Sequence, residues 1–133
     1  MTQSTFIKNF LEWFVIKPKL DNQTKRLKFK EREIWYAHFG TNIGFEIDGK
    51  AEFLRPCLII KKISNETFFA IPLTSKLKEG SWYYPSLIKG KEGRYIFSQM
   101  RILDAKRLNY FVETINEEEF RNIKKKFMEF FDT

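Results

Sequence analysis

Residues 57–73 read CLIIKKISNETFFAIPL, two apolar runs separated by a polar triplet. The triplet consists of Ser64, Asn65 and Glu66, small or polar residues that are common in short turns. Two β-rich runs joined by such a turn are typical of an antiparallel hairpin. We therefore expect the two runs to pair as neighbouring strands.

Further short β-rich runs surround this hairpin. They lie at 34–39, 82–84 and 95–97, with turn residues between them. Several short strands within about 70 residues are typical of a small barrel or sandwich. The expected fold class is therefore mainly β, with helices at the ends of the chain (α+β).

One helix is expected at each end of the chain. The Asn116 side chain can cap the C-terminal helix, and three glutamates follow in its first turn. Phe120, Ile123 and Phe127 recur at helical spacing and form its apolar stripe. Residues 5–16 show a similar apolar stripe and predict an extra N-terminal helix. This stripe favours packing on the domain or on a second copy, and a lipid surface or a partner protein is the alternative.

The 133 residues fit one compact domain. Residues 1–31 carry seven basic and three acidic side chains, whereas residues 32–133 carry seventeen and fourteen. More than half of the net charge of +7 thus lies in the first quarter of the chain. We divide the chain into an N-terminal helix with a basic linker, 1–31, and a main domain, 32–133. The positive excess favours an anionic partner.

The inventory of reactive residues excludes several classes of enzyme. His38 is the only histidine and Cys57 the only cysteine, so a catalytic histidine pair, an intramolecular disulfide and a multi-cysteine zinc site are excluded. We interpret His38 as a partly buried structural residue and Cys57 as a core residue. Glycine motifs that bind nucleotide phosphates are absent, and Gly90 and Gly93 are interpreted as ordinary loop glycines.

The chain also lacks the signals of a membrane or secreted protein. No apolar run approaches the ~20 residues of a membrane helix, and residues 1–4 lack the basic start of a signal peptide. The single cysteine suits a reducing compartment. We expect a cytoplasmic protein with no membrane span.

Arginine, hydroxyl and amide side chains gather at the ends of the expected strands. Guanidinium groups offer a planar fork of donors and hydroxyls offer compact ones, so such residues bind phosphodiesters well. Each of these residues alone more often belongs to a solvated loop. Their joint order and spacing are what favour a phosphodiester site. The set comprises Arg55, Thr74, Ser75, Lys76, Ser98, Gln99 and Arg101.

Three blocks in this order resemble the MazF/PemK/Kid family of endoribonuclease toxins from toxin–antitoxin pairs. The likeness spans residues 32–131 and ends in the same C-terminal helix. The blocks are REIWY at 32–36 with GFE at 44–46 and RPCLII at 55–60, then IPLTS at 71–75, then SQMRILDAKRL at 98–108.

The resemblance implies a small, strongly bent antiparallel β-barrel of the CcdB/Kid/MazF type, working as a homodimer. It implies cleavage of single-stranded RNA without a metal or other cofactor, by attack of the ribose 2′-hydroxyl that leaves 2′,3′-cyclic phosphate and 5′-hydroxyl ends. Arg55 and Thr74 would act at the scissile phosphate. A cognate antitoxin would lay a short segment across the RNA groove. The implied RNA-binding residues are Glu46, Ser75, Lys76, Ser98, Gln99 and Arg101.

Physical chemistry assigns the roles further. An arginine stays protonated at neutral pH, so Arg55 suits charge stabilisation and not proton removal, for which Glu46 is a candidate. The chain departs from the family pattern at Phe45, Ile96 and Ser98, and five residues separate Gly49 from Arg55 where one is common. These departures leave an alternative open: a non-catalytic barrel that binds RNA or a protein through the same surface.

Overall fold

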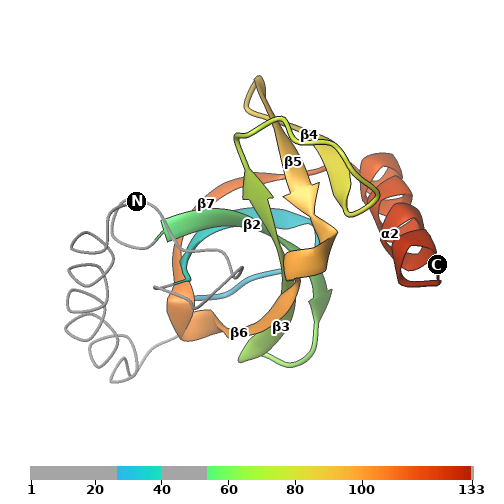
Figure 1. The fold of residues 1–133 in the computed structure, drawn as a ribbon. Coiled ribbons are helices and arrows are strands. Elements are labelled where there is room, and N and C mark those ends of the chain that lie inside the picture. Colours follow the sequence, from blue (N-terminus) through green and yellow to red (C-terminus); the bar gives the residue numbers. More distant parts are fainter. Residues whose placement is uncertain (1–26, 40–53, 133) are drawn as a thin grey trace, which may run out of the picture.

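The computed structural model describes residues 27–39 and 54–132 (Figure 1). A strongly curved antiparallel sheet forms a half-barrel, and one C-terminal helix packs beside it. This confirms the expected fold class, whereas the predicted N-terminal helix at 5–16 lies outside the described residues. The elements, in chain order, are β1 (Glu33–His38), β2 (Leu54–Lys62), β3 (Thr67–Thr74), β4 (Tyr83–Ile88), β5 (Lys91–Ile96), η1 (Phe97–Gln99), β6 (Arg101–Asp104), η2 (Ala105–Arg107), β7 (Leu108–Thr114) and α2 (Glu117–Asp132).

The strand order is β4-β5-β3-β2-β1-β7, and β6 also pairs with β3. The expected hairpin is confirmed, because β2 pairs antiparallel with β3 and places Cys57 opposite Pro72. The Ser64 hydroxyl closes its turn by accepting the backbone N–H groups of Glu66 and Thr67, at 3.1 and 3.2 Å. The local turn chemistry therefore set this pairing, as the polar triplet indicated.

Two strands were not indicated by the sequence patterns, β6 and β7. The first has only four residues. The second does not alternate between buried and exposed positions, because Tyr110 and Phe111 are both exposed. Strand β2 also begins three residues earlier than expected, at Leu54, so that Arg55 belongs to the strand itself.

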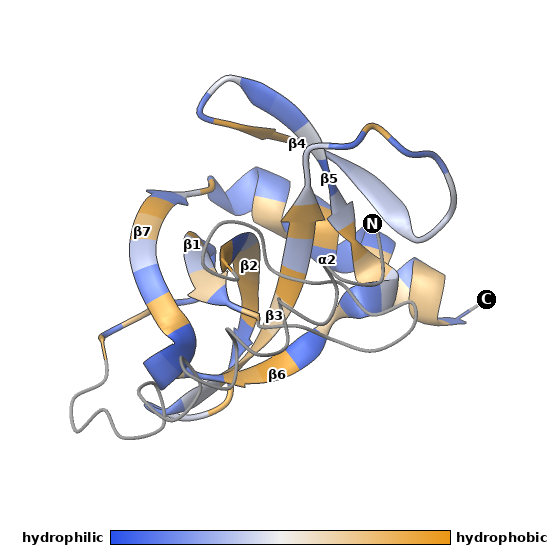
Figure 2. Cartoon of the chain, turned by 60° about the vertical axis from the view of Figure 1, so that its left-hand side comes forward, coloured by the Kyte–Doolittle hydropathy of each residue, from blue (hydrophilic) through white to orange (hydrophobic). Residues whose placement is uncertain are grey.

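Alternating residues of the central strands feed two separate hydrophobic cores. Along β2, Cys57 and Ile59 belong to the inner cluster, enclosed by the curved sheet, whereas Leu58 and Ile60 belong to the outer cluster, which includes residues of α2. Figure 2 shows hydrophobic residues along these central strands. The period-two alternation of a strand thus supplies both cores from one segment.

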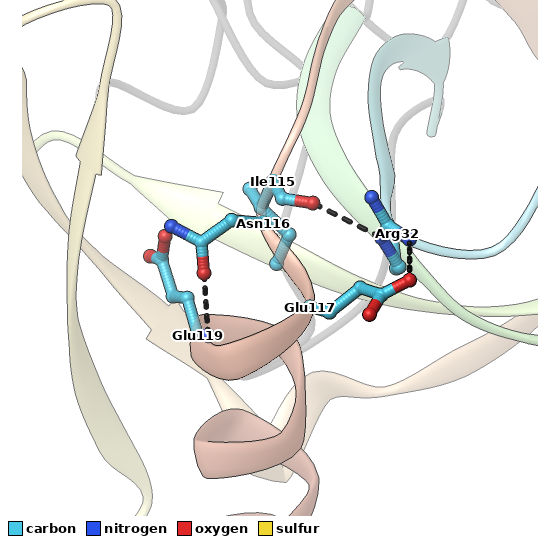
Figure 3. Close-up of polar contacts among 5 residues, drawn as sticks. All are labelled: Arg32, Ile115, Asn116, Glu117 and Glu119. Atoms are coloured by element: carbon cyan, nitrogen blue, oxygen red, sulfur yellow. Dashed lines mark hydrogen bonds and ion pairs between the residues drawn. The ribbon is translucent and has the colours of Figure 1, made fainter.

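Helix α2 is anchored where β1 begins (Figure 3). The Asn116 side chain accepts the backbone N–H of Glu119 at 2.7 Å, which confirms the predicted cap. Arg32 donates from Nε to the carbonyl of Ile115 at 3.1 Å and pairs with Glu117 at 3.2 Å. These contacts hold the first turn of the helix against the sheet.

The buried face of α2 agrees with the expected apolar stripe. Phe120 and Ile123 are buried in the outer cluster. Further along the helix, Phe127 packs edge-on against Phe97, with ring centroids 5.4 Å apart. The helix therefore covers one end of the outer face of the sheet.

The last residues of the predicted basic linker pack into the barrel. Phe29 is buried in the inner cluster, with its ring centroid 4.9 Å from that of Phe68. The Lys62 ammonium lies 4.8 Å from the centroid of the same Phe29 ring and donates to the Phe29 carbonyl at 3.3 Å. The Glu31 carboxylate accepts the Lys62 backbone N–H at 2.8 Å. Residues 29–31 thus help to hold the end of β2.

Candidate functional site

Arg55 and Thr74 lie on the adjacent strands β2 and β3. Continuing the register of Cys57 and Pro72 by two positions sets Arg55 opposite Thr74. The Arg55 side chain is buried, with 9% of the residue exposed, and its Nη1 donates to the carbonyl of Leu73 at 3.2 Å. The guanidinium therefore contacts the peptide group that precedes Thr74.

Thr74 ends β3 at a tight junction with β5. Its hydroxyl accepts the backbone N–H of Lys76 at 3.2 Å. On the other side, a Cβ added to Gly93 would lie 2.5 Å from the Thr74 carbonyl oxygen. Gly93 is buried within β5 and is no loop residue, so its interpretation from the sequence was wrong. Only glycine lets the two backbones approach this closely.

Arg101 faces the same inner side of the sheet as Arg55. It pairs with Ala70 on β3, and Arg55 pairs with Ala37 on β1; both alanines belong to the inner cluster. The Arg101 guanidinium also lies 5.5 Å from the centroid of the Phe39 ring, just after β1. The tertiary structure thus gathers two arginines around the C-terminal end of β1.

A third arginine supports this end of β1. Arg107, on η2, donates to the carbonyl of His38 at 3.1 Å. Burial of its guanidinium, together with the nearby charge of Arg101, lowers the pKa of Arg107, and Asp104 acts in the opposite direction. Arg107 belonged to the third sequence block, but no spacing rule indicated its contact, because β1 is far away in the chain.

The two unusual reactive residues have structural roles. His38 is 8% exposed, and its Nε2 lies 3.4 Å from the amide nitrogen of Asn109, which confirms it as a buried structural residue. Cys57 is fully buried, and burial raises the pKa of its thiol from 9.0 to about 12. The thiol therefore stays protonated at neutral pH and is a core group, as expected.

The remaining predicted site residues are more dispersed. Ser75 and Lys76 follow Thr74 and are exposed. Ser98 is exposed and Gln99 half-buried on η1, which leads from β5 to β6 and Arg101. Glu46 lies outside the described residues.

A groove of about 440 Å³ opens on the opposite face of the same strands. Tyr36, Pro56 and Leu73 line it, and these residues alternate with those that face the inner cluster. Thr74 and Ser75 also line it, so the groove reaches the end of β3. The sequence patterns did not indicate this surface.

In the described part of the chain, no three His, Cys, Asp or Glu side chains are grouped as a metal site requires. Across residues 27–39 and 54–132, no helix combines the length and apolar character needed to cross a membrane.

Comparisons with known proteins agree with this architecture. The family model for the PemK-like, MazF-like toxin of type II toxin–antitoxin systems matches residues 30–131. No match was found among curated proteins.

Several solved structures share the fold. MazF from Deinococcus radiodurans is 16% identical, with a TM-score of 0.60 over 80% of this chain and 99% of that chain. The Mycobacterium tuberculosis toxin MazF-mt6 is 12% identical, with a TM-score of 0.58 over 76% of this chain and 97% of that chain. An endoribonuclease in complex with its cognate antitoxin, from a mycobacterial species, is 12% identical, with a TM-score of 0.54 over 77% and 93%.

Proposed function

The chain belongs to the PemK-like, MazF-like toxin family of type II toxin–antitoxin systems, and from that premise we propose that it is a metal-independent endoribonuclease that cleaves single-stranded RNA. The observation that carries the proposal is the contact between Arg55 and the peptide group next to Thr74. The Arg55 guanidinium carries a permanent positive charge, and the residue that follows its carbonyl partner Leu73 is Thr74, which carries a hydroxyl. That pair suits a phosphodiester.

The proposed reaction is attack of the ribose 2′-hydroxyl on the adjacent phosphorus. The 2′-hydroxyl loses its proton to a base, a bond forms to phosphorus, and the 5′-oxygen leaves and takes up a proton. Negative charge accumulates on the nonbridging oxygens, which the Arg55 guanidinium stabilises. The burial of Arg55 strengthens this interaction, because solvent screens it less. No cofactor takes part.

Thr74 orients a nonbridging oxygen through its hydroxyl. Arg55 cannot remove the 2′-hydroxyl proton, because a guanidinium stays protonated at neutral pH. We assign that step to Glu46, whose carboxylate would give cleavage an acidic limb in its pH profile. A Glu46→Gln variant that keeps both the wild-type rate and this limb would remove the assignment.

RNA next to the scissile linkage would contact exposed donors around the same strand ends. Their side chains supply charge, hydroxyl and amide groups, which suit contacts to the RNA backbone and do not by themselves select a base. The base preference is left open, because the chain departs from the family pattern at Phe45 and between Gly49 and Arg55. The proposed contacts are Ser75, Lys76, Ser98, Gln99 and Arg101.

The proposal extends to partners. We propose a cytoplasmic homodimer held inactive by a cognate antitoxin segment lying across the RNA surface. Its support is the family membership, together with the mycobacterial endoribonuclease of the same fold, whose structure contains its cognate antitoxin. The net charge of +7 would favour an acidic antitoxin segment.

The test is incubation of the full chain with a varied pool of single-stranded RNA in excess chelator, followed by mapping of the new ends. We expect 2′,3′-cyclic phosphate and 5′-hydroxyl ends, and no cleavage at linkages that carry a 2′-deoxy sugar. Arg55→Ala should lower the rate roughly 100- to 1,000-fold. Arg121→Ala, which removes an exposed arginine of α2, should leave it unchanged.

Because Arg55 is buried, Arg55→Lys provides a second variant that keeps the charge but loses the planar fork. We expect it to fold and to remain well below the wild-type rate. Intact RNA across the whole pool, or equal cleavage by the wild type and both variants, would overturn the proposal. Binding with a steep salt dependence but no new ends would instead favour the non-catalytic barrel.

A further inference from the structure

The groove on the outer face carries an exposed aromatic platform. Tyr36 and Tyr110 lie opposite each other on β1 and β7, with ring centroids 4.7 Å apart and an interplanar angle of 18°. Tyr110 is 48% exposed and Phe111 is 47% exposed, and both line the groove. Exposed, adjacent aromatic rings of this kind stack on the bases of single-stranded nucleic acids.

The pairing of β1 with β7 is irregular on both sides of the platform. In a regular strand Tyr110 and Phe111 would point to opposite faces. The pairing of β1 with β7 shifts between Ile34 and Trp35 and again between Tyr36 and Ala37. Both shifts lie outside the pairs of Tyr36 with Tyr110 and of Trp35 with Phe111. Tyr110 therefore stacks on Tyr36 at the groove, whereas the Phe111 ring packs edge-on against Trp35 of the inner cluster, with centroids 5.8 Å apart.

The facing wall supplies positive charge. Lys89, in the turn between β4 and β5, and Lys91, the first residue of β5, line the groove, and so does Glu92. Lys89 and Gly90 both have positive φ, 52° and 77°, which makes this a tight turn. The Lys89 backbone N–H donates to the Glu113 carboxylate at 3.0 Å, so the turn is tied to β7 beside the aromatic rings.

The groove reaches the end of β3, next to the proposed cleavage site. Thr74 and Ser75 line one end of it, and the Arg55 guanidinium contacts the Leu73 carbonyl, one residue before Thr74. A chain that leaves this end of the groove would therefore pass the end of β3, where Thr74 lies. Its volume of about 440 Å³ is also that of a site for a small ligand or a nucleotide.

We propose that this groove is an RNA subsite, in which a nucleotide flanking the scissile linkage stacks its base on Tyr110 while Lys89 and Lys91 contact its phosphates. The inference rests on the proposed function and adds to it a specific binding surface. Stacking and phosphate contacts need no fixed base, so this subsite contributes affinity more than sequence preference.

The test separates binding from cleavage by using a pool of 2′-O-methyl RNA, which lacks the attacking hydroxyl. Tyr110→Ala in the full chain should weaken binding roughly 10- to 100-fold, as expected for the loss of one stacked base. Tyr110→Phe keeps the ring and should bind like the wild type. Phe131→Ala removes an equally prominent aromatic residue from α2, 68% exposed, and should have no effect.

The contribution of Lys89 and Lys91 is measured by the salt dependence of RNA binding. Lys89→Ala and Lys91→Ala should each reduce the slope of log affinity against log salt by about 0.7, the value for one phosphate contact on a single strand. Lys125→Ala, on the exposed face of α2, is the matched control and should leave the slope unchanged.

If the wild-type protein cleaves RNA and Tyr110→Ala binds RNA as tightly as the wild type, the subsite is overturned and the proposed function stands. Loss of binding in Tyr110→Ala, with no cleavage by the wild type, would support the subsite and overturn the nuclease. Sedimentation of each variant supplies a third outcome. If Tyr110→Ala separates two copies without changing RNA affinity, the groove is an interface between copies and the inference fails.

Discussion

The two faces of strands β1, β2 and β3 are built from alternate residues of the same segments, yet they differ in what they leave uncovered. The inner face closes on a cluster that includes Ala37 and Cys57, and two arginines, Arg55 and Arg101, lie at its end. The outer face is covered by α2 at one end and remains open as a groove at the other. The inner face thus ends in two arginines, whereas the outer face leaves exposed aromatic residues of β7 at an open groove.

The largest effects are expected from removing core volume on either face. Ile59 in the inner cluster and Ile123 in the outer cluster are fully buried. Ile59→Ala and Ile123→Ala should each lower the free energy of unfolding by about 2–5 kcal/mol, through lost burial and the cavity left behind. Denaturant unfolding measures both.

The comparison is sharpened by cleavage assays under conditions where both variants are folded. Ile59 pairs with Ala70, which in turn pairs with Arg101, so Ile59→Ala leaves a cavity beside an arginine of the site. It should therefore slow RNA cleavage, whereas Ile123→Ala should not. Equal cleavage rates in the two folded variants would show that the inner face does not position the site.

Gly93→Ala should disturb the candidate site by displacing the backbone of β5 next to Thr74. The new methyl group would meet the Thr74 carbonyl at 2.5 Å, so β5 must move, at a cost of about 1–3 kcal/mol. We expect a lower melting temperature and slower cleavage. Gly90→Asn in the same hairpin is the control, because no atom lies within 4 Å and asparagine tolerates positive φ. A Gly93→Ala protein as stable and as active as the wild type would contradict the tight junction.

A smaller effect is expected at the cap of α2. Asn116→Ala removes the acceptor for the Glu119 N–H and should lower the free energy of unfolding by about 1 kcal/mol. Asn122→Ala, at an exposed position inside the same helix, should be neutral or slightly stabilising. Urea titration of both variants checks this, and equal destabilisation would mean that the cap does not contribute.

The smallest effect on stability at neutral pH is expected from two buried groups that lose a proton only at high pH, the thiol of Cys57 and the phenol of Tyr95. Burial raises the pKa of Cys57 from 9.0 to about 12 on the inner face. On the outer face, burial and the charges of Glu119 and Glu113 raise the pKa of Tyr95 above its ordinary value of 10.0. The folded protein then keeps protons that the unfolded chain releases. Stability is therefore complete below pH 9 and falls as the pH rises above it.

Stability measured against pH tests this on each face separately. Cys57→Ala should decline less steeply than the wild type above pH 9, and Tyr95→Phe less steeply above pH 10. Parallel curves for the wild type and both variants would exclude these two groups as the cause of alkaline unfolding.

Local chemistry explains which parts were predictable. The hairpin around Ser64 and the helix after Asn116 depend on side-chain to backbone hydrogen bonds within three residues. Such bonds are encoded in neighbouring positions. By contrast, β7 escaped prediction because its two exposed aromatic residues disturb the alternation that marks a strand.

The candidate site was only partly accessible from the residues alone. Arg55 and Thr74 were selected by residue type and by family resemblance, and their contact through Leu73 required the register of β2 and β3. Gly93 was misassigned because the crowding that requires glycine comes from the Thr74 carbonyl, on another strand. The role of Arg107 could not be predicted either, because its partner, the His38 carbonyl, lies on a strand far away in the sequence.

The amino-acid sequence alone determined the β-rich character, the central hairpin, the capped C-terminal helix and the buried status of Cys57, because these follow from local hydrogen bonding and apolar periodicity. The tertiary structure alone decided which strands meet, how two arginines gather at one barrel end, and how Tyr110 stacks on Tyr36 at the groove. Those features depend on long-range register, and a register shift of one residue turns a side chain to the opposite face.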